Sequence, residues 1–186
     1  MNIYIDFDGT LFDTNRFYND FLLLCEKYNV NKKDIIKPKG LFNLDNLALQ
    51  LKIKYNLNNS FIKETNKLYN PSYLYKDSIS FLKKYYKKYN LNILTFGDYE
   101  YQLKKINCCK FKKYFKRIII TEDKTKEDID YKNSIFIDNS PKDLKKLMSV
   151  GATNLIRIKH DDDPYSKESS LSDINEYFAL NDIDML

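Results

Sequence analysis

The stretch IYIDFDGTLFDTN, residues 3–15, decides the fold, because its apolar run ends abruptly in two acids, Asp6 and Asp8. Side chains two residues apart in a β-strand point the same way, so two buried carboxylates at this spacing repel each other. A cation or a reacting substrate placed between them removes that cost. The stretch therefore predicts a buried strand that carries a charged site at its carboxyl end.

Further apolar runs continue this pattern along the chain, and each is typical of a strand buried on both faces. The predicted strands are Asn2–Phe7, Leu91–Phe96, Arg117–Thr121, Ser134–Asp138 and Asn154–Ile158. Helical patterns separate the last four, at Asp77–Tyr89, Asp98–Ile106 and Pro141–Val150. Strands that alternate with helices predict an α/β fold with a parallel, doubly wound sheet.

One region interrupts the alternation, because residues 15–75 contain no strand pattern. This region predicts helices at about Arg16–Tyr28, Leu44–Tyr55 and Ser60–Leu68. A short turn is expected near Asn31–Ile36, and Pro38-Lys39-Gly40 is expected to separate two helices. A segment of this length is too long for a simple crossover. We therefore expect a catalytic core formed by residues 1–14 and 76–186, with residues 15–75 inserted as a small all-helical lobe. Near the C-terminus, Leu171–Leu180 is expected to form a last helix.

The composition excludes several classes of protein. The 186 residues are 43% hydrophobic and carry 31 basic and 26 acidic side chains, with the lysines scattered rather than gathered in a groove-reading motif. We therefore expect no nucleic-acid partner, and no apolar run is long enough to predict a membrane span. The cysteines Cys25, Cys108 and Cys109 predict neither a disulfide framework nor a zinc site, which favours free thiols and a cytoplasmic protein. The single histidine, His160, lies in a polar stretch and is expected at the surface.

Polar residues gather where the predicted strands end, and ligands of open parallel sheets bind at that edge. The candidates are Asp6 and Asp8 after the first strand, Thr95 and Gly97 at the second, Lys124 after the third, and Asp138, Asn139 and Asp143 at the fourth. Together they predict an oxygen-rich cation site beside a site for a phosphate-sized anion.

This chemistry suits phosphoryl transfer. Mg²⁺ prefers about six oxygen ligands, and the carboxylates of Asp6 and Asp138 with the backbone carbonyl of Asp8 could supply some of them. The Thr95 hydroxyl, backbone N–H groups such as that of Gly97, and a lysine could bind the phosphate. Asp6 could then attack as the nucleophile, and Asp8 could act as acid and base.

Three segments resemble motifs of the haloacid dehalogenase superfamily, most of whose members are phosphatases. Asp6–Leu11 resembles the first motif, Ile93–Thr95 the second, and Ile135–Asn139 with Asp143 the fourth. The resemblance implies a Rossmann-like core with a C1-type cap, here the helical insert. It also implies Asp6 as nucleophile, Asp8 as acid/base, Mg²⁺ at Asp6, Asp8 and Asp138, and phosphate contacts from Thr95 and a lysine.

Two positions depart from the family pattern. The lysine of the third motif is either Lys124 or Lys126, and Lys124 is favoured because it lies nearer to the end of its strand. Asn139 stands where many relatives carry a second aspartate, which lowers the charge of the site by one. Asn139 can still orient a water of the metal, and Asp143 is expected nearby in the metal site.

The sequence thus predicts a Mg²⁺-dependent phosphohydrolase that cleaves a small phosphorylated metabolite through an aspartyl-phosphate. A phosphotransferase or mutase on the same core and a catalytically silent binding module are the alternatives. Dehalogenation is disfavoured because relatives that perform it lack the second aspartate of the first motif, which Asp8 supplies here. Polar residues of the insert that could reach the substrate are Arg16, Asn19 and Lys39.

Overall fold

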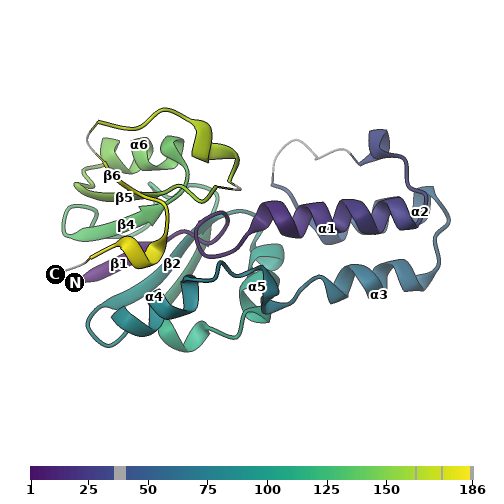
Figure 1. Ribbon diagram of the computed structural model, residues 1–186, viewed down its shortest axis with the longest axis horizontal. Coiled ribbons are helices and arrows are strands. Elements are labelled where there is room, and N and C mark those ends of the chain that lie inside the picture. The colour runs from purple at the N-terminus through teal and green to yellow at the C-terminus, as the bar shows by residue number, and fades with distance from the viewer. Residues whose placement is uncertain (36–40, 162, 173, 185–186) are drawn as a thin grey trace.

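A six-stranded parallel sheet forms the centre of the protein, as the computed structural model shows for residues 1–35, 41–161, 163–172 and 174–184 (Figure 1). The strands are β1 (Asn2–Ile5), β2 (Asn90–Phe96), β3 (Arg117–Thr121), β4 (Ser134–Asp138), β5 (Asn154–Ile158) and β6 (Asn175–Tyr177). They lie in the order β3-β2-β1-β4-β5-β6, and every neighbouring pair is parallel. The predicted α/β fold with a doubly wound sheet is confirmed.

The helices follow the predicted ones closely. They are α1 (Thr14–Lys27), α2 (Leu44–Lys54), α3 (Asn59–Lys67), α4 (Ser78–Tyr85), α5 (Tyr99–Cys108) and α6 (Pro141–Ser149). Short 3₁₀ turns lie at η1 (Lys32–Asp34), η2 (Pro71–Tyr73), η3 (Lys112–Tyr114), η4 (Pro164–Lys167) and η5 (Leu180–Asp182). Polar side chains fix the helix starts: Asp98 accepts a bond from the N–H of Tyr101, and Ser140 accepts one from that of Asp143.

Each face of the sheet has its own core, because successive residues of a strand point to opposite faces. Ile3 and Ile5 of β1 belong to the cluster that includes side chains of α4 and α5. Tyr4 belongs to the cluster on the α6 side, where its ring stacks on Phe136 with 5.4 Å between the ring centroids. Burial on both faces explains why the strands read as almost continuous apolar runs.

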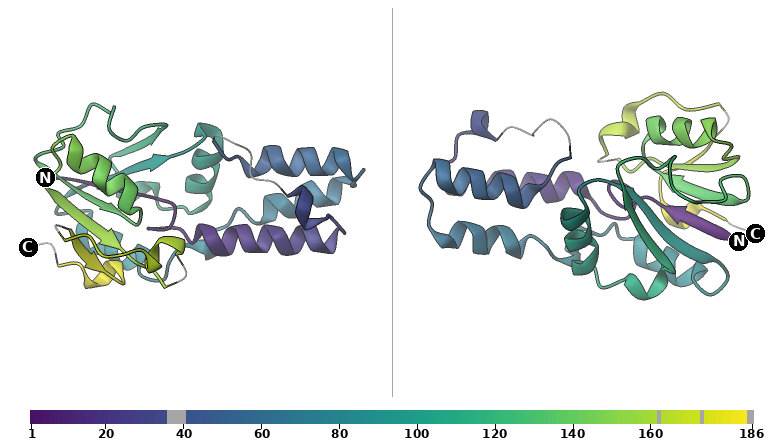
Figure 2. Two further views of the ribbon diagram at one scale, coloured as in Figure 1. Left: turned by 90° about the horizontal axis from the view of Figure 1, so that it is seen from above. Right: turned by 180° about the vertical axis from the view of Figure 1, so that it is seen from behind.

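The helices α1, α2 and α3 extend away from the sheet as a separate lobe, which all views show (Figures 1 and 2). The chain enters and leaves this lobe through two paired segments. The N–H of Asp13 donates to the Tyr73 carbonyl at 2.7 Å, and the N–H of Tyr75 donates to the Leu11 carbonyl at 3.1 Å. Arg16 lies in this neck, where its guanidinium donates to the Ser72 carbonyl. The division into two domains at these points stays a prediction.

The lobe also contacts α5, which follows β2. Lys104 of α5 forms an ion pair with Asp45 of α2 at 2.7 Å and donates to Asn66 of α3 at 2.8 Å. Asn43 donates to Asp98 at 2.9 Å. These bonds hold the lobe beside the carboxyl ends of β1 and β2, the edge where the sequence places the candidate site.

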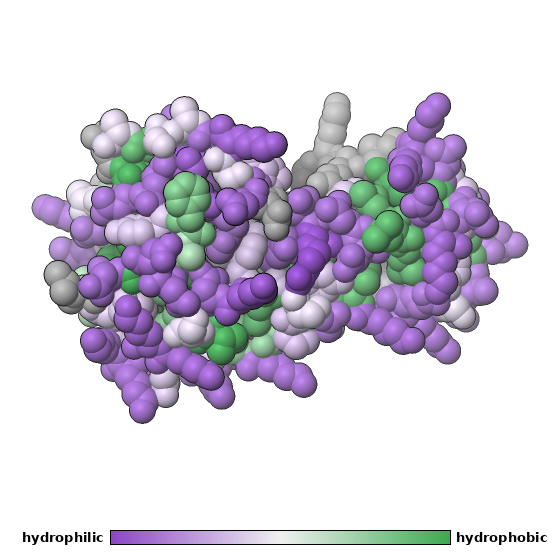
Figure 3. Space-filling view, in the orientation of Figure 1, coloured by the Kyte–Doolittle hydropathy of each residue, from purple (hydrophilic) through white to green (hydrophobic). Residues whose placement is uncertain are grey.

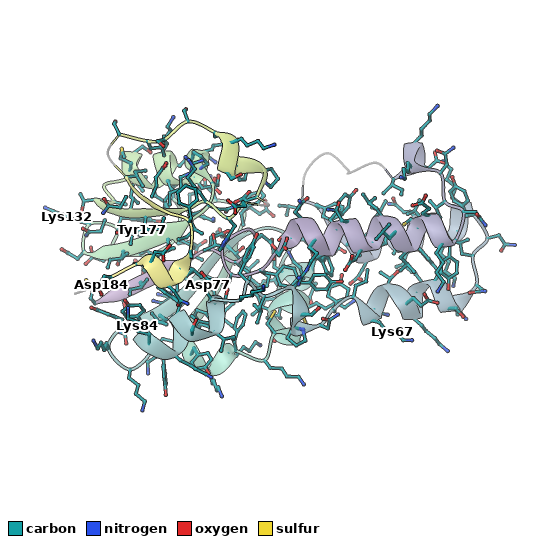
Figure 4. All side chains as sticks on the ribbon, viewed as in Figure 1. Lys67, Asp77, Lys84, Lys132, Tyr177 and Asp184 are labelled. Atoms are coloured by element: carbon teal, nitrogen blue, oxygen red, sulfur yellow. The ribbon has the colours of Figure 1, made fainter. Side chains whose placement is uncertain are left out.

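The expected helix at Leu171–Leu180 is wrong, because β6 and the start of η5 lie within this range. Glu176 of β6 forms an ion pair at 2.8 Å with Arg157 of β5, whose side chain is fully buried. This pairing favours an extended edge strand. After β6 the chain packs beside α4, where the N–H of Leu180 donates to Asp77 and Lys84 lies near Asp184 (Figure 4).

Replacing Glu176 by Gln is expected to lower the free energy of unfolding by about 3 kcal/mol at neutral pH, because Arg157 would keep only neutral partners in the interior. Burial opposes ionisation of Glu176, but bonds from Ser170 and Arg157 lower its pKa from 4.5 to about 2. A carboxyl group whose pKa is lower in the folded than in the unfolded protein stabilises the fold at pH values above its unfolded-state pKa. This stabilisation is lost as the pH falls toward the folded-state pKa. The difference in unfolding free energy between the wild type and Glu176→Gln should therefore shrink as the pH falls from 4.5 toward 2.

Urea unfolding at several pH values measures this difference. Glu168→Gln is the matched control, since Glu168 is exposed. Equal losses in the two variants would show that the Glu176 pair contributes nothing special.

The surface is mainly hydrophilic, with hydrophobic side chains visible over the helical lobe (Figure 3). Leu23 of α1 and Ile53 of α2 are 63% and 80% exposed. None of the helices in the described part of the chain is long and apolar enough to cross a membrane.

Candidate active site

The centre of the candidate site is one lysine held by carboxylates from two strand ends. Lys124 Nζ lies 2.8 Å from Asp6 Oδ1 and 2.6 Å from Asp138 Oδ2, and all three side chains are buried. A third carboxylate, that of Asp143, lies 3.5 Å from the same nitrogen. Asp6 follows β1 and Asp138 ends β4, and these strands are neighbours in the sheet. The fold thus brings four predicted site residues together.

Backbone bonds fix the two buried acids. The N–H of Asp6 donates to the Ile137 carbonyl at 2.8 Å, which continues the pairing of β1 with β4. Asp138 Oδ1 accepts from the N–H of Ser140 at 2.8 Å, where α6 begins. These bonds fix the backbone of Asp6 and the carboxylate of Asp138.

Burial dominates the electrostatics of this cluster. It raises the pKa of Asp6 to about 8, with Lys124 opposing the shift and Asp138 adding to it. Burial also raises the pKa of Asp138, again against the effect of Lys124. For Lys124, burial disfavours the charge, but the carboxylates of Asp138 and Asp6 outweigh it and raise the pKa. The site therefore needs positive charge to keep its acids ionised.

The two candidate lysines occupy different environments. Lys124 contacts the acid cluster, whereas the Lys126 side chain is 81% exposed and pairs with Asp123 at the surface. The geometry favours Lys124 as the lysine of the site. Tyr131 holds the segment in place, since its hydroxyl donates to the Lys124 carbonyl at 2.9 Å.

Two hydroxyls near the site lack a partner. Thr95 Oγ1 and Thr10 Oγ1 are buried polar atoms without a hydrogen bond within the described residues. Such atoms are costly unless a ligand satisfies them. Thr95 ends β2 and was expected to bind phosphate, so its free hydroxyl fits that expectation.

The Gly97 N–H, which the sequence analysis predicts to bind phosphate, donates to the Thr121 carbonyl at 3.1 Å in this structure. Gly97 instead allows close packing. A Cβ on Gly97 would lie 2.6 Å from Gln102 Nε2, and the φ of Gly97 is +148°. The lack of a side chain lets Gln102 reach Asp8, to which its Nε2 donates at 2.6 Å.

Asp8 has partners that the sequence analysis missed. Its carboxylate contacts Lys105 Nζ at 2.5 and 2.7 Å and also accepts a bond from Thr14 at 2.5 Å. The Lys105 side chain is only 1% exposed, and its ammonium lies 4.6 Å from the centre of the Tyr101 ring. Burial alone would raise the pKa of Asp8, but Lys105 and the bonds from Thr14 and Gln102 lower it. Asp8 is thus held ionised, beside the cluster rather than within it.

Asn139 links the site to the loop after β5. Its Nδ2 donates to Asp163 Oδ2 at 2.5 Å, and Asp163 is buried. Asn139 also packs on Gly9, where a Cβ would lie 2.1 Å from Asn139 Nδ2. The Asn139 amide is therefore bound to an acid that lies 24 residues further along the chain.

His160 is not the surface residue that the sequence predicts. It is 8% exposed, and its ring stacks on Tyr75 with 3.5 Å between the ring centroids. Its Nε2 lies 3.1 Å from the Thr10 carbonyl oxygen, to which it donates. His160 therefore supports the loop after β1. Of the predicted lobe contacts, Asn19 is exposed outside the cavity described next, and Lys39 lies outside the described residues.

A cavity of about 210 Å³ adjoins Asp8, between the helical lobe and the carboxyl edge of the sheet. Asn139 and Asp163 line one side, and residues of the lobe such as Tyr18 line the other.

The donors fit a hard divalent cation. Three carboxylates around one ammonium group carry a net charge of −2 (three minus one) when all are ionised, and carboxylate oxygens suit Mg²⁺. Within the described ranges, no three acidic, thiol or imidazole side chains are arranged to hold a metal as they stand. Lys124 lies where Asp6 and Asp138 converge, which explains this result. Burial raises the pKa of Asp6, and a cation bound beside its carboxylate would favour the ionised form.

Comparison with known proteins identifies relatives. The model of the haloacid dehalogenase-like hydrolase family matches residues 3–145, and no curated protein matches the chain. A haloacid dehalogenase-like hydrolase of Burkholderia xenovorans LB400 has a similar structure, with a TM-score of 0.75 at 15% identity over 97% of this chain and 93% of that one.

Two further structures share the fold. The HAD-hydrolase YfnB of Bacillus subtilis, bound to magnesium, gives a TM-score of 0.64 at 15% identity and covers 97% of this chain and 95% of that one. The L-2-haloacid dehalogenase of Xanthobacter autotrophicus gives 0.63 at 12% identity, with 97% and 95% covered. These likenesses concern the fold alone.

Proposed function

The chain belongs to the haloacid dehalogenase-like hydrolase family, and from this premise we propose that it is a Mg²⁺-dependent phosphohydrolase of small phosphomonoesters. Asp6 is the nucleophile, Asp8 the acid and base, and the helical lobe is a cap over the site. Asp6, Asp138 and the backbone carbonyl of Asp8 would hold Mg²⁺, with Asp143 and Asn139 around it.

One observation carries this proposal: Lys124 is buried among three carboxylates at the strand ends. In addition, the buried hydroxyl of Thr95, in the neighbouring strand β2, has no hydrogen-bond partner among the described residues. The arrangement combines excess negative charge, which a divalent cation neutralises, with donors that suit a phosphate. The magnesium-bound fold relative supports the choice of metal.

The chemistry proceeds in two displacements. A carboxylate oxygen of Asp6 attacks phosphorus, the bond to the leaving oxygen breaks, and the protonated form of Asp8 gives its proton to that oxygen. Water then attacks the phosphorus of the aspartyl-phosphate, Asp8 takes its proton, and phosphate leaves with Asp6 restored. Lys105 favours ionised Asp8, which suits the second displacement. When bound, the metal neutralises charge on the phosphate and keeps Asp6 ionised.

The presence of Asp8 also disfavours dehalogenation, because an acid and base at this position protonates a leaving oxygen and deprotonates a water. Transfer of the phosphoryl group to a second alcohol uses the same residues. The fate of the aspartyl-phosphate separates these functions: hydrolysis releases inorganic phosphate, whereas transfer yields a new phosphate ester.

Removing the metal is expected to abolish turnover. With an aryl phosphate as substrate, we expect phosphate release in Mg²⁺ to fall at least about 100-fold in excess chelator and to return when Mg²⁺ is restored. Calorimetry on the same sample should show that Mg²⁺ binds. Turnover that persists in chelator would contradict a metal-dependent mechanism, and absence of both turnover and Mg²⁺ binding would favour the silent module.

A further inference from the structure

The cavity beside Asp8 has aromatic walls. Five of its lining residues are aromatic: Tyr18, Phe42, Tyr75, Tyr101 and Tyr165. They come from the helical lobe, its neck, α5 and the loop after β5, so that rings face the cavity from both the lobe and the core. Asp8 lines the same cavity, which places these walls next to the residue that meets the leaving oxygen.

Several of these rings are held in place by other rings. Phe42 packs edge to face against Tyr18, with centroids 5.9 Å apart, and against Tyr101, with centroids 5.8 Å apart. Tyr75 stacks on the buried His160 at 3.5 Å. A wall that is already ordered costs little entropy when a ligand binds against it.

The size of the cavity suits one ring system. An apolar cavity of about 150 Å³ in another protein holds one benzene molecule. The cavity here has about 210 Å³, which leaves room for one ring and the atoms that join it to a phosphate.

The charge of the walls disfavours an anionic ligand. Among the described lining residues, the charged side chains are those of Asp8 and Asp163, and there is no lysine or arginine. Asp8 is paired with Lys105, whereas Asp163 accepts bonds from the neutral Asn139 amide and the Tyr165 N–H. A carboxylate on the leaving group would therefore meet acids of the same sign.

We propose that this cavity selects the substrate, and that the leaving alcohol carries a planar ring, aromatic or heteroaromatic, without a negative charge. The inference rests on the proposed function, since it assumes a phosphate placed between Asp6 and Thr95. Each stacked or edge-to-face contact between rings strengthens binding by about 2- to 12-fold beyond the effect of burial alone. Two or three such contacts distinguish a planar ring from a saturated one of equal size.

The test compares three phosphate esters of the same alcohol class. Benzyl phosphate carries the planar ring, cyclohexylmethyl phosphate a saturated ring of similar size, and 4-carboxybenzyl phosphate an added charge. We expect kcat/KM for benzyl phosphate to exceed that for each of the other two about tenfold, mainly through KM. Equal values for the planar and saturated esters, or a preference for the carboxylated ester, would overturn the inference while leaving the phosphatase function intact.

A pair of variants assigns the preference to the cavity. Tyr165 is 41% exposed, so Tyr165→Leu should fold normally, and we expect it to reduce the benzyl preference at least about threefold. Tyr99 is 58% exposed and does not line the cavity, which makes Tyr99→Leu the matched control. A preference that is unchanged in Tyr165→Leu, or equally reduced in Tyr99→Leu, would place its origin elsewhere.

Binding of the matching phosphonates separates this inference from the proposed function. Calorimetry in Mg²⁺ should show that benzylphosphonate binds about tenfold more tightly than cyclohexylmethylphosphonate. That result without hydrolysis of any ester would uphold the ring-binding cavity and refute the phosphatase. Equal binding of the two phosphonates would refute the cavity assignment, whatever the turnover.

Discussion

Asp6→Asn is expected to lower kcat for phosphate release by about 10,000-fold or more, because the amide cannot attack phosphorus. The substitution keeps the size and shape of the side chain. It also removes one of three carboxylates around Lys124, so the cluster loses charge without losing its cation. We therefore expect the variant to fold and to keep an ordinary thermal transition while turnover disappears.

Steady-state phosphate release in Mg²⁺ measures this effect, with thermal unfolding on the same samples as the check on folding. Asp123→Asn is the matched control, because Asp123 lies after β3 and pairs with the exposed Lys126. The control should keep wild-type turnover within about twofold. Folded Asp6→Asn protein with more than a tenth of the wild-type rate would rule out Asp6 as the nucleophile.

The second large effect concerns Lys124. Lys124→Met is expected to lower kcat/KM by about 100- to 1,000-fold, the loss seen when one donor to a developing anion is removed. The ammonium of Lys124 is the only cationic group that the described structure places within 4.0 Å of both Asp6 and Asp138. Without it, a bound phosphate would lose its donor, and the acids would lose their counter-charge.

Lys126→Met is the matched control, because both lysines lie in one short segment and only Lys124 reaches the acids. We expect Lys126→Met to stay within about twofold of wild type. Inhibition by inorganic phosphate provides a second readout, since it should weaken in Lys124→Met alone. Similar losses in both variants would show that Lys124 has no special place in the site.

Local patterns were sufficient for the sheet and most helices. β3, β4 and β5 have the bounds expected from the sequence, because strands buried on both faces are marked by continuous apolar runs. The helices α5 and α6 begin within one residue of the predicted starts, where Asp98 and Ser140 cap them. β6 was missed because this edge strand has only three residues and is fixed by a pair between Glu176 and the buried Arg157.

The site was predictable only where its residues lie at strand ends. Asp6, Asp138, Asp143 and Lys124 were expected together, and the parallel sheet brings them together. Lys105 was missed, because a lysine in a helix is usually at the surface.

A signal for Lys105 was nevertheless present in the sequence. Tyr101, Lys105 and Cys109 follow one another at intervals of four, and all three are buried on one face of the helix and its end. A lysine within an apolar stripe is a candidate for a buried ion pair. The partner itself, Asp8, lies 97 residues away, so no local pattern could identify it.

His160 illustrates the same limit. Its neighbours in sequence are polar, which predicts a surface loop, but Tyr75 and Thr10 bury it through contacts between distant segments. The bond between Asn139 and Asp163 is likewise invisible in the sequence, since it joins the end of β4 to the loop after β5.

The most direct test of an aspartyl-phosphate mechanism is to trap the phosphoryl group on the protein. The enzyme is quenched during turnover of an aryl phosphate in Mg²⁺, reduced with borohydride, and digested for mass spectrometry. Borohydride converts an aspartyl-phosphate to homoserine, and we predict this change at Asp6, dependent on Mg²⁺ and absent from Asp6→Asn. Sustained phosphate release with reduction at another residue, or with none at Asp6, would contradict the mechanism.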